Sequence, residues 1–170
     1  FCYFSDDLGK SWKKSQSEID LPKRGAMEPG LVELRDGSVM MIIRTQRGSV
    51  YKSYSKDNGV TWSGSESLGL VAPVAPATIA RIPKTGDLLF LWNNAPDKRT
   101  PLTTAISKDE GKTWDHVQNL ENDPRFAYAY TSTLFDGDWA LLSYWVHQRT
   151  AEGHLISLKI AAMEIDWFYQ

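Results

Sequence analysis

The chain has 170 residues, with 19 lysine and arginine side chains against 21 aspartates and glutamates, and a net charge of −2. This balance gives no electrostatic reason to expect binding to nucleic acid or to an anionic membrane surface. No apolar run approaches the length of a membrane span. The single cysteine, Cys2, excludes an internal disulfide framework.

One eight-residue pattern occurs three times, at residues 5–12, 55–62 and 107–114. It reads Ser-x-Asp-x-Gly-x-(Ser/Thr)-Trp, and we call each copy a box. The aspartate can accept hydrogen bonds from amides just ahead of it, the glycine permits a left-handed backbone, and the tryptophan can plug the space between sheets. The spacing of about 50 residues is that of a propeller blade of four strands.

The segments between the boxes read as strands. Each group of strands has a glycine turn between its first two members, at Gly37, Gly86 and Gly137, and such turns between apolar segments predict hairpins. The strands expected, in chain order, are 31–34, 38–45, 49–55 and 65–71, then 77–82, 88–93, 102–107 and 115–120, then 130–134, 139–146 and 154–167. We therefore predict an all-β fold, a β-propeller of four-stranded antiparallel blades, with blades at about 26–72, 73–121 and 122–170 of one domain spanning residues 1–170.

The chain opens inside a blade, since Phe1-Cys2-Tyr3-Phe4 leads directly into the first box. Closed propellers have about four to eight blades, and three are expected here. Two sheet faces of such an arc would be bare and apolar. We therefore expect the C-terminal half of a propeller, paired either with the N-terminal half or with a second copy of itself.

Ligands of propellers usually sit at the axis, so polar residues in or just before the first two strands of each blade are the candidates. The first blade offers Glu28 and Arg44, the second Arg99, and the third Tyr128 and Tyr130. Each candidate could instead have a structural role. Glu28 could be a solvated carboxylate, Arg44 part of an ion pair at the strand end, Arg99 a solvated loop cation, and the tyrosines aromatic side chains of the core. Strand alternation places the two tyrosines on one face, so parity does not separate them.

No metal or other cofactor is expected. The three histidines, His116, His147 and His154, do not have the spacing of metal ligands and read as surface or strand residues.

The box resembles the Asp-box, or bacterial neuraminidase repeat, which lies on the outer rim of sialidase propellers. The set Glu28, Arg44, Arg99 and Tyr130 is similar to the last three blades of a six-bladed exo-α-sialidase, and residues 33–39 and 130–132 are similar to strand motifs of that family. The resemblance implies Tyr130 as nucleophile, Glu28 as general base, and Arg44 and Arg99 as a clamp for the substrate carboxylate. Tyr128 is kept as a binding residue and as the other candidate nucleophile.

The chemistry suits these residue types. Guanidinium groups read a carboxylate bidentately, and a neutral tyrosine is not repelled by the carboxylate on the anomeric carbon of sialic acid. A phenol needs a base at neutral pH, which a glutamate supplies. We therefore expect a retaining glycosidase that releases terminal sialic acid from a sialylated or other acidic glycan, with a secreted or periplasmic location favoured.

Other readings stay open. The family also needs a third arginine and an aspartate acid/base from its first blades, upstream of Phe1, so the chain holds about half a site. It could instead be a non-catalytic glycan-binding or scaffold propeller, or a propeller hydrolase or lyase that acts on another acidic sugar.

Overall fold

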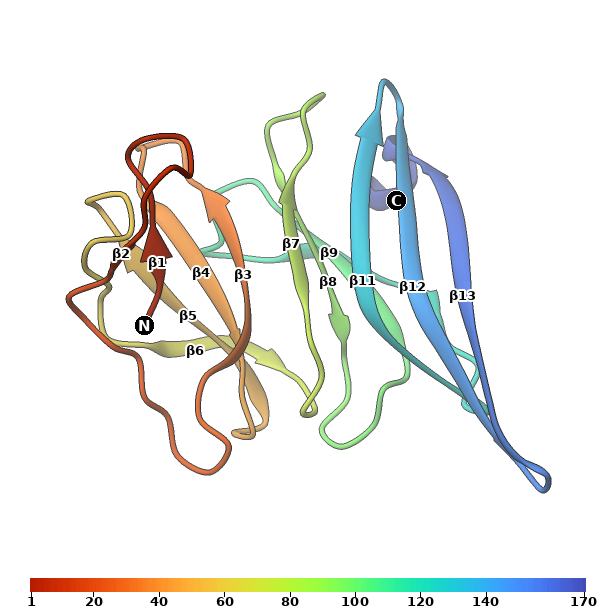
Figure 1. Ribbon diagram of the computed structural model, residues 1–170. Helices are drawn as coiled ribbons and strands as arrows, with labels where there is room; N and C mark the ends of the chain where they lie inside the picture. The colour runs from red at the N-terminus through yellow and green to blue at the C-terminus, as the bar shows by residue number, and fades with distance from the viewer.

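The computed structural model describes residues 1–170, which form four antiparallel sheets and one short 3₁₀ helix. Two sheets have four strands each in sequential order, so the predicted all-β architecture of four-stranded antiparallel sheets is confirmed (Figure 1). The structure has no helix that is long and apolar enough to cross a membrane.

The elements follow in chain order. A two-stranded sheet contains β1 (Tyr3–Phe4) and β2 (Lys13–Lys14). The first sheet contains β3 (Met27–Glu33), β4 (Val39–Arg44), β5 (Ser49–Ser55) and β6 (Glu66–Val71). The second sheet contains β7 (Thr78–Arg81), β8 (Leu88–Asn93), β9 (Leu102–Ser107) and β10 (Asp115–Glu121). The third sheet contains β11 (Phe126–Asp136), β12 (Trp139–Thr150) and β13 (Gly153–Glu164), and η1 (Ile165–Tyr169) follows it.

The three larger sheets stand side by side, and their first strands are neighbours, because β7 contacts both β3 and β11 (Figure 1). The second sheet is covered on both faces. Along β8, Leu88 and Phe90 belong to the core shared with the first sheet, whereas Leu89 and Leu91 belong to the core shared with the third. A strand buried on both sides has no need of alternating polar positions, which explains why β8 is apolar from Leu88 to Trp92.

The last predicted strand, 154–167, is partly wrong. Strand β13 ends at Glu164, and the chain then turns into η1. There the side chains of Ile165 and Phe168 are completely buried in the second core, and the Ile165 amide donates to the Asp138 carbonyl over 2.8 Å. Burial of these two side chains ends the strand, because an extended chain could not turn both of them inward.

Each box closes on itself in the same way. In the third copy the Asp109 carboxylate accepts from the Thr113 amide over 2.8 Å and from the Thr113 hydroxyl over 2.7 Å, and Ser107 Oγ accepts from the Gly111 amide over 2.8 Å. The corresponding bonds of the other two copies join Asp7 to Ser11 and Asp57 to Thr61. The boxes are structural turns, as the pattern predicts.

Candidate functional site

Two of the predicted site residues lie at irregular points of the first strands of their sheets. Glu28 in β3 has φ of 41°, and Tyr130 in β11 has φ of 57°. The pairing register shifts at both places, between Met27 and Gly30 and between Ala129 and Ser132. Left-handed backbone is uncommon for residues with a side chain, and bulges re-aim side chains near active sites. The two irregularities therefore mark this end of the sheets as a candidate site.

The two predicted arginines converge on one backbone oxygen. Arg44 donates from Nη2 to the Val74 carbonyl over 2.9 Å, and Arg99 donates from Nη2 to the same oxygen over 3.4 Å. Arg44 also donates from Nη1 to the Glu28 carboxylate over 2.6 Å. Arg44 is 8% exposed, and its buried Nε has no partner. Two guanidinium groups from different sheets are thus held side by side, with one carboxylate beside them.

Tyr130 lies next to this pair. Its ring is 5.5 Å from Arg99 Cζ, and the side chain is 52% exposed. The Glu28 carboxylate is bound to Arg44 rather than to the Tyr130 hydroxyl. The structure thus brings Glu28 to Arg44, and Arg99 to both Arg44 and Tyr130.

The expectation that Tyr128 and Tyr130 share a face is wrong. The register shift after Ala129 interrupts the strand alternation, so the two side chains point to different surroundings. Tyr128 is 3% exposed and packs in the second core against Tyr144. Burial, together with the charge of Glu121, raises the pKa of Tyr128 to about 12. In this structure Tyr128 is therefore buried in the core, whereas Tyr130 is exposed beside the arginines.

Sequence reasoning missed two groups at this site. The Val74 carbonyl belongs to the connection between β6 and β7, and a backbone oxygen has no signature in sequence. Trp145 in β12 lies against Tyr130, with ring centroids 6.4 Å apart, and Arg99 Cζ is 5.8 Å from its ring. The signal that would have identified Trp145 is its pairing with Ala129, beside the bulge, and this pairing is seen in the structure rather than in the sequence.

The boxes lie at the opposite end of the strands. The second and third boxes follow β5 and β9, each the third strand of its sheet and antiparallel to the second strand, and the first box follows β1. Glu110, inside the third box, accepts from the Arg35 amide over 2.8 Å and from Arg81 Nη2 over 2.7 Å, which ties this box to the first hairpin turns of two sheets. In Figure 1 the boxes occupy the upper end, and the connections that carry the candidate site lie below.

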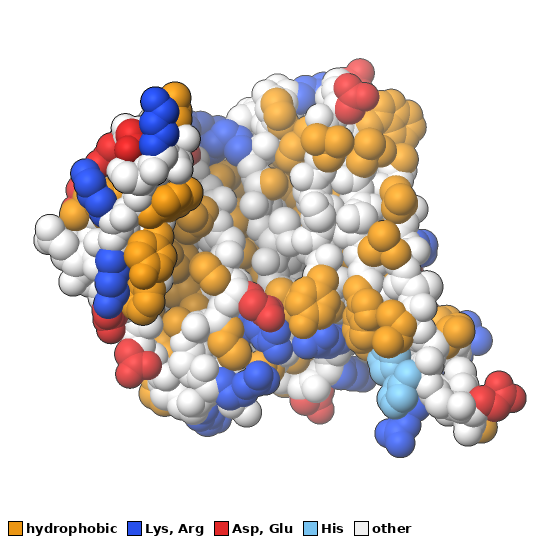
Figure 2. All heavy atoms as spheres, viewed as in Figure 1, with side chains coloured by type: hydrophobic (Ala, Val, Ile, Leu, Met, Phe, Trp, Pro, Cys, Tyr) orange, Lys and Arg blue, Asp and Glu red, His pale blue; other side chains and the backbone are white.

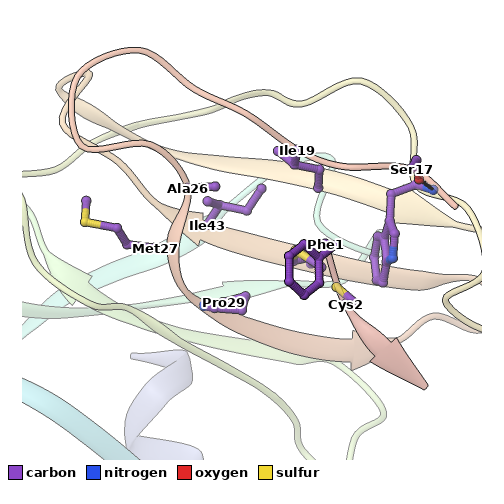
Figure 3. Close-up of a pocket in the computed structure, with 10 residues that line it drawn as sticks. Phe1, Cys2, Ser17, Ile19, Ala26, Met27, Pro29 and Ile43 are labelled. Carbon is purple, nitrogen blue, oxygen red and sulfur yellow. Dashed lines mark hydrogen bonds between the residues drawn. The ribbon is translucent and has the colours of Figure 1, made fainter. Parts of the chain in front are cut away.

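A separate apolar pocket opens beside the N-terminal segment (Figure 3). It encloses about 120 Å³ and is lined by Phe1, Cys2, Met27, Pro29 and other, mainly hydrophobic, side chains. Burial raises the pKa of the Cys2 thiol. With neither a carboxylate nor a cation in its lining, this pocket does not bring together the groups expected for acidic sugars.

The family of this chain follows from comparison with known proteins. Residues 1–142 match the model of the BNR repeat-like domain, so the chain belongs to that family, which confirms the resemblance carried by the boxes. A sialidase of Micromonospora viridifaciens is 28% identical over 155 residues, which are 82% of this chain and 22% of that protein. The chain thus spans about a quarter of the length of the curated relative.

Solved structures agree on the fold. A mutant of the NanB sialidase of Streptococcus pneumoniae superposes with a TM-score of 0.76 at 22% identity, over 96% of this chain and 27% of that one. A polysaccharide lyase, an ulvan lyase bound to a glucuronate-containing oligosaccharide, superposes with a TM-score of 0.65 at 14% identity, over 92% of this chain and 44% of that one. The fold is that of sialidase-type propeller blades.

Proposed function

We propose that this chain carries half of the active site of a retaining exo-α-sialidase, with Tyr130 as nucleophile, Glu28 as general base, and Arg44 and Arg99 as the carboxylate clamp. The observation that carries the proposal is the convergence of both arginines on one carbonyl oxygen beside an exposed tyrosine. The match to a curated sialidase supports the same activity, hydrolysis or transfer of sialic acid.

Substrate binding would reorganise the clamp. In the free chain, the Arg44 guanidinium is bound to Glu28 and to the Val74 carbonyl. A substrate carboxylate that arrives at Arg44 forms charge-assisted bonds stronger than the bond to the Val74 carbonyl, and it competes with the Glu28 carboxylate for the same guanidinium. Glu28 is released as the substrate binds and becomes free to accept a proton. The base is thereby engaged only when a carboxylate occupies the clamp.

The reaction then follows from the residue types. The Tyr130 oxygen attacks the anomeric carbon while Glu28 takes the phenolic proton, and the glycosidic bond breaks. The leaving oxygen takes its proton from an acid outside this chain. Water, or an acceptor hydroxyl, then attacks the tyrosyl-linked sugar and returns the anomeric configuration to that of the substrate.

The test compares two tyrosines that are two residues apart. In the complete protein, Tyr130→Phe is expected to lower turnover of a fluorogenic sialoside by about three orders of magnitude or more. Tyr128→Phe, which alters only a buried side chain, should keep most of the activity. Undiminished turnover in Tyr130→Phe would remove Tyr130 from the nucleophile role, and loss of turnover in Tyr128→Phe alone would reassign it.

An exposed apolar face of the third sheet supports association with a partner that completes the propeller ring. One of its faces exposes Leu134, Leu141, Leu158 and Ile160, which the strand register places together, and Figure 2 shows hydrophobic side chains spaced down this sheet. Exposure of such a face costs about 25 cal/mol per Å². We propose that the N-terminal half of the propeller covers it and contributes the third arginine and the acid/base aspartate.

Light scattering of the purified 170-residue chain tests this assembly. The chain alone is expected to self-associate, and addition of the separately produced N-terminal half should yield a one-to-one complex. A monodisperse monomer that melts cooperatively would contradict the proposal, and a symmetric dimer unaffected by the N-terminal half would identify a second copy as the partner.

A lyase or hydrolase acting on another acidic sugar is the second candidate, favoured by the superposition on the ulvan lyase. The same arginines would bind a uronate carboxylate, and Tyr130 would serve as base instead of nucleophile. The readouts differ: appearance of an unsaturated uronate, detected by its ultraviolet absorbance, identifies the lyase. Glycan binding without any turnover would identify a binding module.

A further inference from the structure

Tyr130 has little to hold it in place other than aromatic neighbours. Its left-handed backbone lies within the register shift, so the strand pairs on either side are Ala129 with Trp145 and Ser132 with Ser143. The side chain is half exposed. Its ring meets the ring of Trp145 edge to face, with centroids 6.4 Å apart and planes at 89°.

Trp145 touches the clamp as well. Arg99 Cζ lies 5.8 Å from the Trp145 ring and 5.5 Å from the Tyr130 ring, so one guanidinium covers both aromatic side chains. Cation–π contacts of this kind favour arginine, and they fix the guanidinium relative to the rings. Trp145 therefore contacts the proposed nucleophile and a clamp arginine at once.

The other side of Trp145 is held by two histidines. His147 stacks on Trp145 with centroids 5.1 Å apart and planes at 23°, and His154 of β13 stacks on His147 with centroids 4.9 Å apart. The two imidazoles also share a hydrogen bond of 2.7 Å between His147 Nε2 and His154 Nδ1. Figure 2 shows histidine side chains beside hydrophobic ones where β12 and β13 project from the sheets.

We propose that Trp145 is a positioning residue, which holds the Tyr130 ring and the Arg99 guanidinium in one arrangement and is itself held by the stacked pair of His147 and His154. The inference rests on the proposed function, because it assigns Trp145 to the same site. It uses the stacking surface of the histidines and not their ability to carry a proton.

The first experiment needs no activity. In the complete protein with ¹³C-labelled tyrosine, the Tyr130 ring signals are assigned by Tyr130→Phe, and Trp145→Ala is expected to move them through loss of the ring current. His147→Ala should move them in the same direction by less, and His147→Phe, which keeps the stack, should not. Trp139→Ala is the control, since Trp139 lies six residues earlier on β12 and pairs with Asp136, at the far end of β11 from Tyr130.

The second experiment measures turnover of a fluorogenic sialoside. Trp145→Ala is expected to lower kcat about tenfold and to raise KM several-fold, because nucleophile and clamp both lose their support, and Trp145→Phe should restore most of both. General destabilisation would lower kcat alone, by loss of active protein.

Three results decide the proposal. Unmoved Tyr130 signals in Trp145→Ala, or unchanged kcat and KM, overturn it. Loss of activity in His147→Phe equal to that in His147→Ala would show that the imidazole itself acts, and would overturn the stacking role. If the wild-type protein turns over no sialoside, the proposed function fails, and the tyrosine signals still decide whether Trp145 holds Tyr130.

Discussion

The two ends of the sheets differ in how their polar groups are satisfied. The aspartate and the serine of each box find their partners within eight residues, as in the bonds of Asp109 to Thr113 and of Ser107 to Gly111. At the other end, Arg44 depends on Glu28 and on Val74, 16 and 30 residues away. Local turns are complete as soon as the chain bends, whereas the candidate site exists only when two sheets have docked. Substitutions at the two ends should therefore fail in different ways.

The largest effect is expected from Arg44→Met. It removes the charge that holds Glu28 and the bond to Val74, and the carboxylate of a ligand would lose its principal partner. Truncation of one member of such a pair costs about 2–5 kcal/mol of binding. Titration calorimetry of the complete protein with 2,3-didehydro-2-deoxy-sialic acid should show this loss, with Arg47→Met, an exposed arginine near the same strand end, as control. Equal binding by both variants would contradict a clamp at Arg44.

A second comparison lies within the boxes. Gly111 and Gly9 have nearly the same φ, 79° and 83°, but an added Cβ would lie 2.9 Å from Met40 Cε at Gly111 and 3.8 Å from Trp12 at Gly9. Alanine in the left-handed region costs roughly 1–2 kcal/mol at either position, and Gly111→Ala adds the displacement of Met40. Urea unfolding should show the larger loss for Gly111→Ala. Identical losses would mean that Met40 moves aside freely.

Asp109→Ala tests whether the hydrogen bonds within a box stabilise the fold without affecting the candidate site. The amide and hydroxyl of Thr113 and the hydroxyl of Ser107 lose their acceptor, at a cost of roughly 1 kcal/mol at this partly exposed turn. Ligand affinity measured in parallel with Arg44→Met should be unchanged, and Asp115→Ala, an exposed aspartate just beyond the same box, should change neither quantity. A fall in affinity for Asp109→Ala would show that the two ends are coupled.

The smallest effect is a dependence of stability on pH. The hydroxyl and amide of Ser11 lower the pKa of Asp7 to about 2, and the corresponding groups of Thr113 lower that of Asp109 to about 2. Because the folded pKa values are depressed, this contribution is complete above pH 3.8 and is lost as the pH falls toward 2. The difference in thermal unfolding between wild type and the Asp7→Asn, Asp109→Asn double variant should shrink as the pH falls from 3.8 toward 2. A constant difference from pH 6 to pH 2 would refute this account.

The sequence predicts the turns of the boxes well because eight adjacent residues contain the bonding partners of the box aspartate and serine. It also locates the strands of the three larger sheets, because burial on two faces leaves continuous apolar runs such as that of β8. It misses the short strands β1 and β2, the starts of β3 and β11, and the ends of β12 and β13. It does not separate Tyr128 from Tyr130. The bulge that separates them depends on pairing with β12, and strand alternation alone cannot reveal an extra residue.

The remaining parts of the candidate site have no signal in sequence. The Val74 carbonyl is an acceptor that any residue would supply, and its place depends on how β6 and β7 are joined. Trp145 reads as one of seven tryptophans in a β protein until its contacts with Arg99 and Tyr130 are seen. These groups become functional candidates through docking of the sheets rather than through residue type.

Strand β13 is hydrogen-bonded to β12 on one side only, over 12 residues. Its free edge presents unpaired amides and carbonyls along a run that includes Leu155, Ile156, Leu158 and Ile160, all more than half exposed. Lysines on edge strands discourage pairing with foreign strands, but Lys159, the single charge between Leu155 and Ala162, is engaged by Glu121. Unless it is capped by another strand, this edge is a template for intermolecular sheet growth, so the solubility of the isolated chain is limited by aggregation rather than by the stability of its folded cores.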